Sequence, residues 1–243
     1  MRYGQPTMKK REFIAQDLLS KIYQHRDRPL EKLPPERRLA QEYGVSRFTL
    51  RKALEKLVAI GAVSIVQGAG IFINPGVGSN PLLYNSITEK KFNQISYRLL
   101  ELHKRRPDGD ERQIFGLTDN DFIWAFTRLR KVDGVNVQLE YARMPTAGFA
   151  DLTPETIEHS IQQYLLRKGC ALSHSLTHYR ATTVSKAQAE RLACKKGIAA
   201  MHILNRGILP DGRVAIFSDI IDIDYACSYV IPFNRDNLAF RQT

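Results

Sequence analysis

The most constraining feature of this sequence is a series of helix and strand patterns within its first 75 residues. In residues 9–25, apolar side chains recur at the spacing of one helix face, and a proline-containing stretch ends the pattern. Residues 36–43 fit a short second helix that stops at Gly44. Ser46 then suits the N-cap of a third helix, whose apolar stripe runs to Gly61. This order predicts two helices joined by a tight turn, with another helix before them.

Two short β-rich runs follow the third helix. Residues 62–66 and 70–73 are rich in β-branched side chains, and the segment of Gln67, Gly68 and Ala69 between them is typical of a tight hairpin turn. A glycine-rich nucleotide-binding loop would lead from a strand into a helix, whereas this segment joins two strands. We therefore interpret residues 1–75 as a winged helix-turn-helix domain of α/β type.

The third helix begins with residue types that suit contact with DNA. Arg47 and Arg51 lie four residues apart, so they share a helix face from which a guanidinium can bind guanine or phosphate. Ser46 and Thr49 are short hydroxyl donors at the helix N-terminus, where phosphate binds well. A basic helix face alone is more often a solvated surface. Its place between a helix-turn pattern and a hairpin favours the interpretation that it reads DNA.

The charge distribution agrees with this interpretation. The chain has 36 basic and 25 acidic side chains and a formal net charge of +11. Residues 1–75 carry 14 basic and 7 acidic side chains, and the rest of the chain carries 22 and 18. The excess is concentrated in the first third, which favours a polyanionic partner there.

Residues 33–40, 45–54 and 67–73 together resemble the GntR family of bacterial transcription regulators. The resemblance spans about residues 9–74. It implies that three arginines contact DNA, namely Arg37, Arg47 and Arg51. It also implies that the hydroxyl groups of Ser46 and Thr49 contact phosphates, and that the wing tip, Gln67 and Gly68, enters the minor groove. Pro35 and Phe48 depart from the family's usual small residues, and Phe48 could pack on a thymine methyl group.

Beyond the winged domain, residues 76–94 are rich in turn formers and are expected to be a linker, with a boundary near Pro75. A second domain should then occupy residues 95–243. Its strand patterns cover residues 122–130, 135–143, 171–182, 199–209 and 214–224, and its helical patterns cover residues 111–115, 154–168 and 185–194. Glycine-containing turns at residues 133–134 and 211–212 join strands as hairpins, so we expect an antiparallel α+β domain.

Three charged residues of this second domain are candidates for ligand binding. Arg128 and Arg130 share one face of a predicted strand and could together bind a phosphate or carboxylate, although they could equally be surface arginines. Glu140 lies across the hairpin turn. It could accept hydrogen bonds from sugar hydroxyls or an ammonium group, or form a salt bridge with the arginines.

The order of these patterns resembles the UTRA ligand-binding domain of the HutC subfamily within GntR. The matching segments lie within residues 116–117, 128–130, 139–145, 160–162 and 211–214. The resemblance implies a fold like that of chorismate lyase and a small polar or phosphorylated effector, with Ser96, Tyr97 and Ser160 as further effector contacts. Gln162 and Ile216 depart from the family pattern, which makes an amino-sugar phosphate a poor guess. The resemblance also implies a homodimeric repressor released from its operator by this effector.

Two other functions remain open at this stage. The second domain could retain lyase-like activity, although no acid–base or nucleophile constellation supports an enzyme. Alternatively, the chain could be an effector-free nucleic-acid protein, in which case Arg128 and Arg130 would be solvated.

No cofactor, metal or membrane segment is predicted. His174 and His178 share a strand face, but no further ligand completes a zinc site nearby. The three cysteines are widely spaced, as expected for free thiols in a reducing compartment, and no stretch approaches the roughly 18 apolar residues of a membrane helix. We therefore expect a cytoplasmic protein.

Overall fold

The computed structural model describes residues 9–24, 31–74, 83–85, 90 and 92–229. The chain divides into two compact units, one formed by Met1–Glu89 with Ala226–Thr243 and the other by Lys90–Tyr225. Each unit is described by itself. The expected boundary near Pro75 and most of the expected linker lie outside the described residues.

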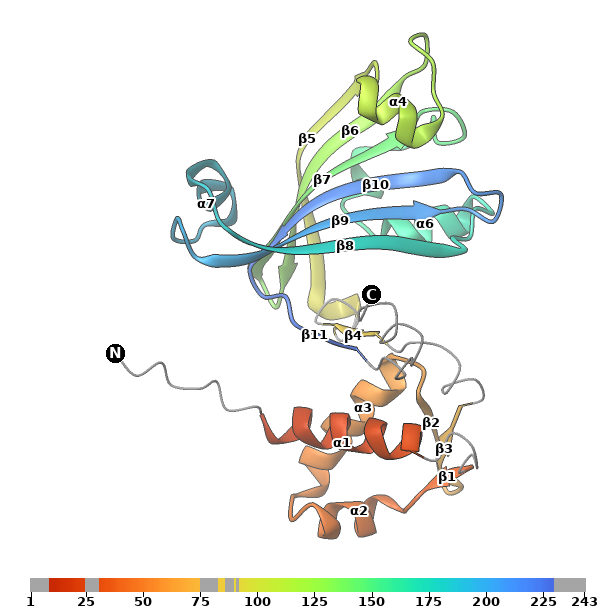
Figure 1. Cartoon of the computed structure of the whole chain (residues 1–243), viewed down its shortest axis with the longest axis vertical. Coiled ribbons are helices and arrows are strands. Elements are labelled where there is room, and N and C mark those ends of the chain that lie inside the picture. The colour runs from red at the N-terminus through yellow and green to blue at the C-terminus, as the bar shows by residue number, and fades with distance from the viewer. Residues whose placement is uncertain (1–8, 25–30, 75–82, 86–89, 91, 230–243) are drawn as a thin grey trace, which may run out of the picture. The chain divides into compact units, whose positions relative to one another are not determined.

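The first unit contains the predicted winged helix-turn-helix (Figure 1). Its main elements are α1 Lys10–Gln24, β1 Lys32–Leu33, α2 Glu36–Glu42, α3 Arg47–Ala59, β2 Val63–Val66 and β3 Gly70–Ile73. The three strands form an antiparallel sheet in the order β1-β3-β2. The sequence patterns do not predict β1, because a two-residue strand has no visible periodicity. The three helices and the hairpin are confirmed.

Local chemistry explains where α3 begins and ends. The Ser46 hydroxyl accepts a hydrogen bond from the Thr49 N–H, so Ser46 is the N-cap that the sequence predicts. Gly61 adopts a φ of +71°, a conformation that glycine takes with little strain and that turns the chain into the wing. Between these ends, Leu50, Leu54 and Leu57 are almost fully buried against α1 and the sheet.

A two-stranded antiparallel sheet also belongs to this unit. It pairs β4 Leu83–Asn85 with β11 Cys227–Tyr229. Part of the segment expected as a linker is therefore a strand, and its partner comes from the far end of the chain.

The second unit is the expected α+β domain with an antiparallel sheet. Its six strands are β5 Ile95–Arg105, β6 Ile123–Val132, β7 Val135–Pro145, β8 His174–Thr183, β9 Ala199–Ile208 and β10 Val214–Asp222, ordered β5-β6-β7-β10-β9-β8. Its helical elements are η1 Phe92–Gln94, α4 Gly109–Phe115, α5 Pro154–Ile157, α6 Ile161–Arg167 and α7 Lys186–Leu192. At the β6–β7 turn, Asp133 and Gly134 both have positive φ, as the predicted hairpin requires.

Two apolar clusters lie on opposite faces of this sheet. Phe126, Ala142 and Met144 pack with α5 and α6 on one face. Leu129 and Leu139, at alternate strand positions, pack with α7 on the other. Figure 1 shows α6 behind the sheet and α7 at one end of it. By the same alternation, the sheet face covered by α5 and α6 also carries residues 128, 130, 138 and 140.

Two elements differ from the sequence prediction. The patterns do not indicate β5, because a bulge between Leu99 and Glu101 interrupts its alternation: Leu99 and Leu102 lie three positions apart, yet both pack with the α5–α6 cluster. The single helical pattern of residues 154–168 is two short helices instead. No helix in the described part of the chain is long and apolar enough to span a bilayer.

Candidate DNA-contacting surface and effector site

The N-terminal end of α3 presents an ordered hydroxyl pair. The Ser46 Oγ and Thr49 Oγ1 atoms are 3.0 Å apart, and Ser46 also accepts from the Thr49 N–H at 3.2 Å. Both residues thus lie at a helix N-terminus, where the dipole and the unpaired N–H groups attract phosphate.

The cations predicted to contact DNA lie on α2 and in the first two turns of α3. Arg37 on α2, and Arg47 and Arg51 on α3, are all exposed. Phe48 is 70% exposed, and the Lys52 Nζ lies 5.7 Å from the centre of its ring. A phenylalanine left this accessible beside several cations suits a surface that becomes covered by a partner.

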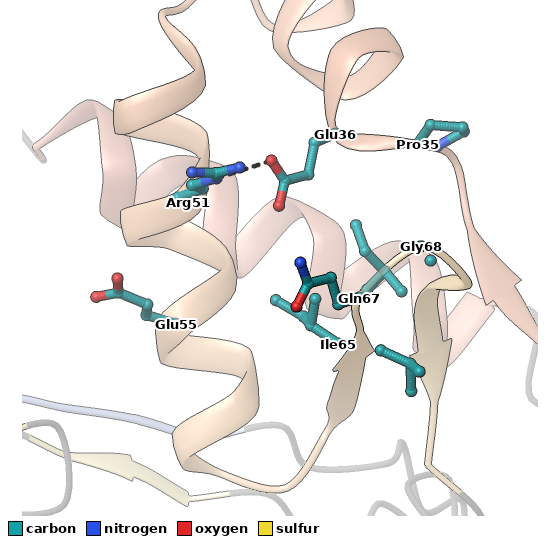
Figure 2. A pocket seen from close by; sticks show the side chains of 10 residues that line it. Pro35, Glu36, Arg51, Glu55, Ile65, Gln67 and Gly68 are labelled. Carbon is teal, nitrogen blue, oxygen red and sulfur yellow. Dashed lines mark hydrogen bonds and ion pairs between the residues drawn. The ribbon is translucent and has the colours of Figure 1, made fainter.

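The wing and α3 border a groove of about 570 Å³. Arg51 lines it from α3, and Gln67 and Gly68 line it from the wing tip, as Figure 2 shows. Gly68 has a φ of +77°, which suits the tight turn predicted there. The other DNA-contact candidates, Arg37, Ser46, Arg47, Phe48 and Thr49, do not line this groove.

Two acidic residues of this groove are not predicted from sequence. Glu36 accepts a hydrogen bond from the Arg51 Nε at 2.9 Å, and Glu55 binds Lys52 at 2.8 Å. The first pair joins residues 15 positions apart on two helices, so helical spacing gives no signal for it. The second pair has i,i+3 spacing and could have been expected.

In the second unit, Arg128 lies in the interior of the domain. Its side chain and that of Glu140 are each 7% exposed, and its Nε donates to a Glu140 carboxylate oxygen at 2.6 Å. The two residues are direct cross-strand partners on β6 and β7. The Arg128 Nη1 donates to the carbonyl oxygens of Ile157 and His159 at 2.8 and 3.1 Å. The alternative that Arg128 is a solvated surface residue is therefore wrong.

These hydrogen bonds explain why the predicted helix of residues 154–168 is broken. The Ile157 and His159 carbonyl groups are bonded to Arg128, and Ser160 caps the new helix α6 by accepting from the Gln163 N–H. The Glu158 carboxylate accepts from the Leu99 N–H at the β5 bulge, at 2.8 Å. The link between α5 and α6, residues 158–160, is thus hydrogen-bonded to the sheet through the side chains of Arg128 and Glu158.

Glu140 and Tyr97 complete the surroundings of Arg128. The Ser218 hydroxyl donates to the second Glu140 carboxylate oxygen at 2.6 Å, so both oxygens are bonded. The Tyr97 ring centre lies 4.2 Å from the Arg128 guanidinium carbon, a close cation–π contact. Of the two alternatives left open for Glu140, the salt bridge is the one present in the structure.

A second buried polar row lies beside the first. Arg130, Gln138 and Asp222 are register partners across β6, β7 and β10, and each is less than 5% exposed. Surface exposure is therefore excluded for Arg130 too. Burial raises the pKa of Asp222 to about 6, although the Asp224 N–H and the charge of Arg130 favour its ionised form. The Gln138 Oε1 is buried and finds no hydrogen-bond partner among the described residues.

The remaining effector candidates are placed differently. Ser160 is the N-cap of α6 and directly follows His159, which binds Arg128. Ser96 is exposed and lies next to Tyr97 on β5, so it points to the opposite face of the sheet. The structure brings Tyr97, Arg128, Glu140 and Ser160 into one region and leaves Ser96 out of it.

Sequence reasoning misses Ser218, Gln138 and Asp222. Ser218 and Asp222 lie four positions apart on β10, and both are almost fully buried, so the two-residue period of a strand would have placed them on one face. The contact with Glu140, 78 residues away, has no local signal.

Comparisons with known proteins identify the family of each unit. Residues 10–73 match the family model "Bacterial regulatory proteins, gntR family", and residues 93–221 match the UTRA domain model, which alone covers more than half of the chain. The chain is a UTRA-domain regulator of the gntR family. It is therefore a DNA-binding transcriptional regulator with an effector-binding domain, and not an enzyme.

Similar proteins extend along most of this regulator. It is 26% identical over 219 residues to the uncharacterized HTH-type transcriptional regulator YydK of Bacillus subtilis (strain 168), covering 88% of this chain and 92% of that one. It is 27% identical over 214 residues to the mannosyl-D-glycerate transport/metabolism system repressor MngR of Escherichia coli (strain K12), covering 84% and 88%. The crystal structure of YydK has a TM-score of 0.56 at 24% identity, covering 93% of this regulator and all of that chain.

Proposed function

We propose that this regulator is a homodimeric repressor of the HutC subfamily that acts in the cytoplasm and leaves its operator when a small anionic metabolite binds the UTRA domain. Two named relatives of similar architecture, MngR of Escherichia coli and NagR of Bacillus subtilis, are repressors. Two winged domains on one dimer would match a palindromic operator.

The winged domain supplies the DNA contacts in this proposal. Arg47 and Arg51 bind base edges or phosphates in the major groove, Ser46 and Thr49 bind phosphates, and Phe48 packs on a base methyl group. Arg37 adds a further cation, and Gln67 and Gly68 at the wing tip enter the minor groove. All of these residues except the half-buried Thr49 are exposed, which supports these roles, because an exposed side chain gives up few protein contacts when DNA arrives.

The observation that carries the effector proposal is the hydrogen bonding of buried Arg128 to two main-chain carbonyl groups. A carboxylate or phosphate is a stronger acceptor for a guanidinium than a neutral carbonyl group. An anion that reaches Arg128 can therefore replace the Ile157 and His159 oxygens and release the α5–α6 link. Arg130, Tyr97 and Ser160 lie on the same side of the sheet and would complete the site.

Such a replacement supplies the two states that ligand control requires. Without effector, Arg128 holds the α5–α6 link; with effector, the anion holds Arg128. A coupling free energy of about 1–3 kcal/mol between effector and operator would change operator affinity roughly 5–150-fold.

The effector site is tested by calorimetry of the full chain against phosphorylated sugars and organic acids. We expect one class of anion to bind the parent protein, and Arg128→Lys to lose that binding because a lysine cannot replace the guanidinium fork. Arg191→Lys is the matched control, since Arg191 forms a more exposed ion pair with Glu101 in the same domain. Equal anion binding by Arg128→Lys and the parent would contradict the site.

A further inference from the structure

The strongest unassigned feature is the ion pair that joins the two helices of the DNA-contacting domain. The Arg51 Nε donates to a Glu36 carboxylate oxygen at 2.9 Å, and the side chains are 64% and 25% exposed. Figure 2 shows Glu36 reaching from α2 to Arg51 on α3, at the edge of the groove that the wing tip also borders. A carboxylate is an unexpected neighbour for a side chain that must meet a polyanion.

The atom used in this pair decides what Arg51 can still do. A guanidinium has five N–H donors, and the bond to Glu36 uses the Nε–H. The two terminal nitrogens can still form the bidentate contact with guanine O6 and N7 that reads this base. Because Glu36 comes from another helix, the pair also fixes the direction in which the long side chain leaves α3.

Two other exposed ion pairs on these helices, Arg38 with Glu42 and Lys52 with Glu55, lack this arrangement. Arg38 on α2 donates from Nε to Glu42 at the same 2.9 Å distance, but both residues belong to one helix. Lys52 and Glu55 likewise pair within α3. Pairs of this kind on an exposed helix face contribute little to helix stability, and they do not connect two helices.

We propose that Glu36 is a positioning residue that holds Arg51 for base reading, so that operator specificity depends on a carboxylate that does not itself touch a base. This rests on the proposed role of Arg51 in contacting DNA. Two opposite effects follow. Glu36 pre-orders Arg51 and thereby favours the correct sequence, whereas its negative charge near the phosphates weakens binding to every sequence.

The proposal is tested by measuring the affinity of the full chain for its selected operator and for a scrambled duplex at one salt concentration. We expect Glu36→Ala and the isosteric Glu36→Gln to lower the ratio of specific to non-specific affinity about tenfold, which is within the range of couplings measured between contacting residues. Binding to the scrambled duplex should stay equal or strengthen. A loss of folding would instead weaken both duplexes together.

Two further variants separate positioning from helix stability. In an Arg51→Ala background, Glu36→Ala should leave the ratio unchanged, because no guanidinium remains to be positioned. Glu42→Ala removes the ion pair between Arg38 and Glu42, which lies within one helix, and should also leave the ratio of specific to non-specific affinity unchanged.

A ratio of specific to non-specific affinity within about twofold of the parent for Glu36→Ala would overturn the proposal, since coupled contacting residues show larger effects. An equal loss in the Arg51→Ala background would overturn it as well. If the parent chain itself prefers no duplex, the DNA-reading function fails as well. The two failures are therefore distinguishable.

Discussion

The arginines of the two units contrast in their surroundings. In the winged domain, Arg47 and Arg51 are exposed, and the only partner described for Arg51 among residues 31–74 is one carboxylate on a neighbouring helix. In the UTRA domain, Arg128 and Arg130 are almost fully buried, and Arg128 binds a carboxylate, two carbonyl groups and an aromatic face.

This contrast indicates how arginine could serve two functions in one chain, contact with DNA and binding of a small anion. A polyanion as large as DNA comes to the protein surface, so its partners must be exposed, and their removal should cost affinity rather than stability. In the proposed function, a small effector binds inside the UTRA domain, so the residues that contact it hold the fold together before it binds. The following predictions test this division, beginning with the largest expected effect.

Arg128→Ala should strongly destabilise the UTRA domain. It leaves the Glu140 carboxylate buried without its cation, which typically costs about 3–5 kcal/mol in the free energy of unfolding. The measurement is chemical denaturation of the full chain, with Arg47→Ala as the control that should unfold like the parent. The double variant Arg128→Met with Glu140→Leu should recover most of the loss, because it buries no charge. If the Arg128→Ala protein were as stable as the parent, Arg128 would not stabilise the fold, and the difference between the arginines of the two units would be contradicted.

Asp222 should make stability depend on pH in the acid range. Its pKa is raised from the ordinary 3.8 to about 6, so the folded chain binds this proton more tightly than the unfolded chain does. Its contribution to the free energy of unfolding therefore falls as pH rises from about 4 to about 6, by roughly 2–3 kcal/mol, and is constant above that.

The variant Asp222→Asn isolates this contribution, because it keeps the shape of the protonated side chain. At pH 7 it should be more stable than the parent, and near pH 4 the two should be equal. A stability difference that does not change between pH 4 and pH 7 would show that Asp222 does not titrate in this window.

Arg47→Ala should weaken DNA binding without affecting folding. If Arg47 reads a base, the loss should be about 1–3 kcal/mol at one base pair, with relaxed specificity there. If it contacts only phosphate, all sequences should weaken equally and the salt dependence should decrease. Affinity measurements on single-base operator variants distinguish the two cases, and unchanged affinity for every duplex would remove Arg47 from the interface.

The smallest effect concerns two serine N-caps in the UTRA domain. Ser160 caps α6 and Ser185 caps α7, so replacing either by alanine should cost about 1 kcal/mol of stability. Only Ser160→Ala should also raise the effector concentration needed to release DNA, because only Ser160 adjoins the Arg128 site. An equal shift for both variants would reduce Ser160 to a structural cap.

Most of the fold could be predicted because its signals are local. Ser46 as an N-cap, Gly61 as a helix stop and the turn of Asp133 and Gly134 each depend on residues within a few positions. Strand β5 could not be predicted, since its bulge interrupts the alternation at Leu99. The helix break between Ile157 and Ser160 depends on Arg128, about 30 residues away in sequence.

The candidate sites divide in the same way. The exposed residues proposed to contact DNA follow from helix spacing and turn chemistry. The partners of the buried groups do not, because Ser218 meets Glu140 and Glu36 meets Arg51 only after the chain has folded. Burial itself was the missing information for Arg128, which sequence alone could not distinguish from a surface arginine.

The most direct test of the central claim is selection of duplexes from a randomised library by the full chain, followed by fluorescence-polarisation binding with and without a panel of small anions. We expect one palindromic sequence to be enriched and one anion to weaken its binding roughly 5–150-fold, as a coupling of about 1–3 kcal/mol would give. Enrichment of no sequence would contradict DNA reading by α3. A selected operator whose affinity no anion changes would contradict effector control through Arg128.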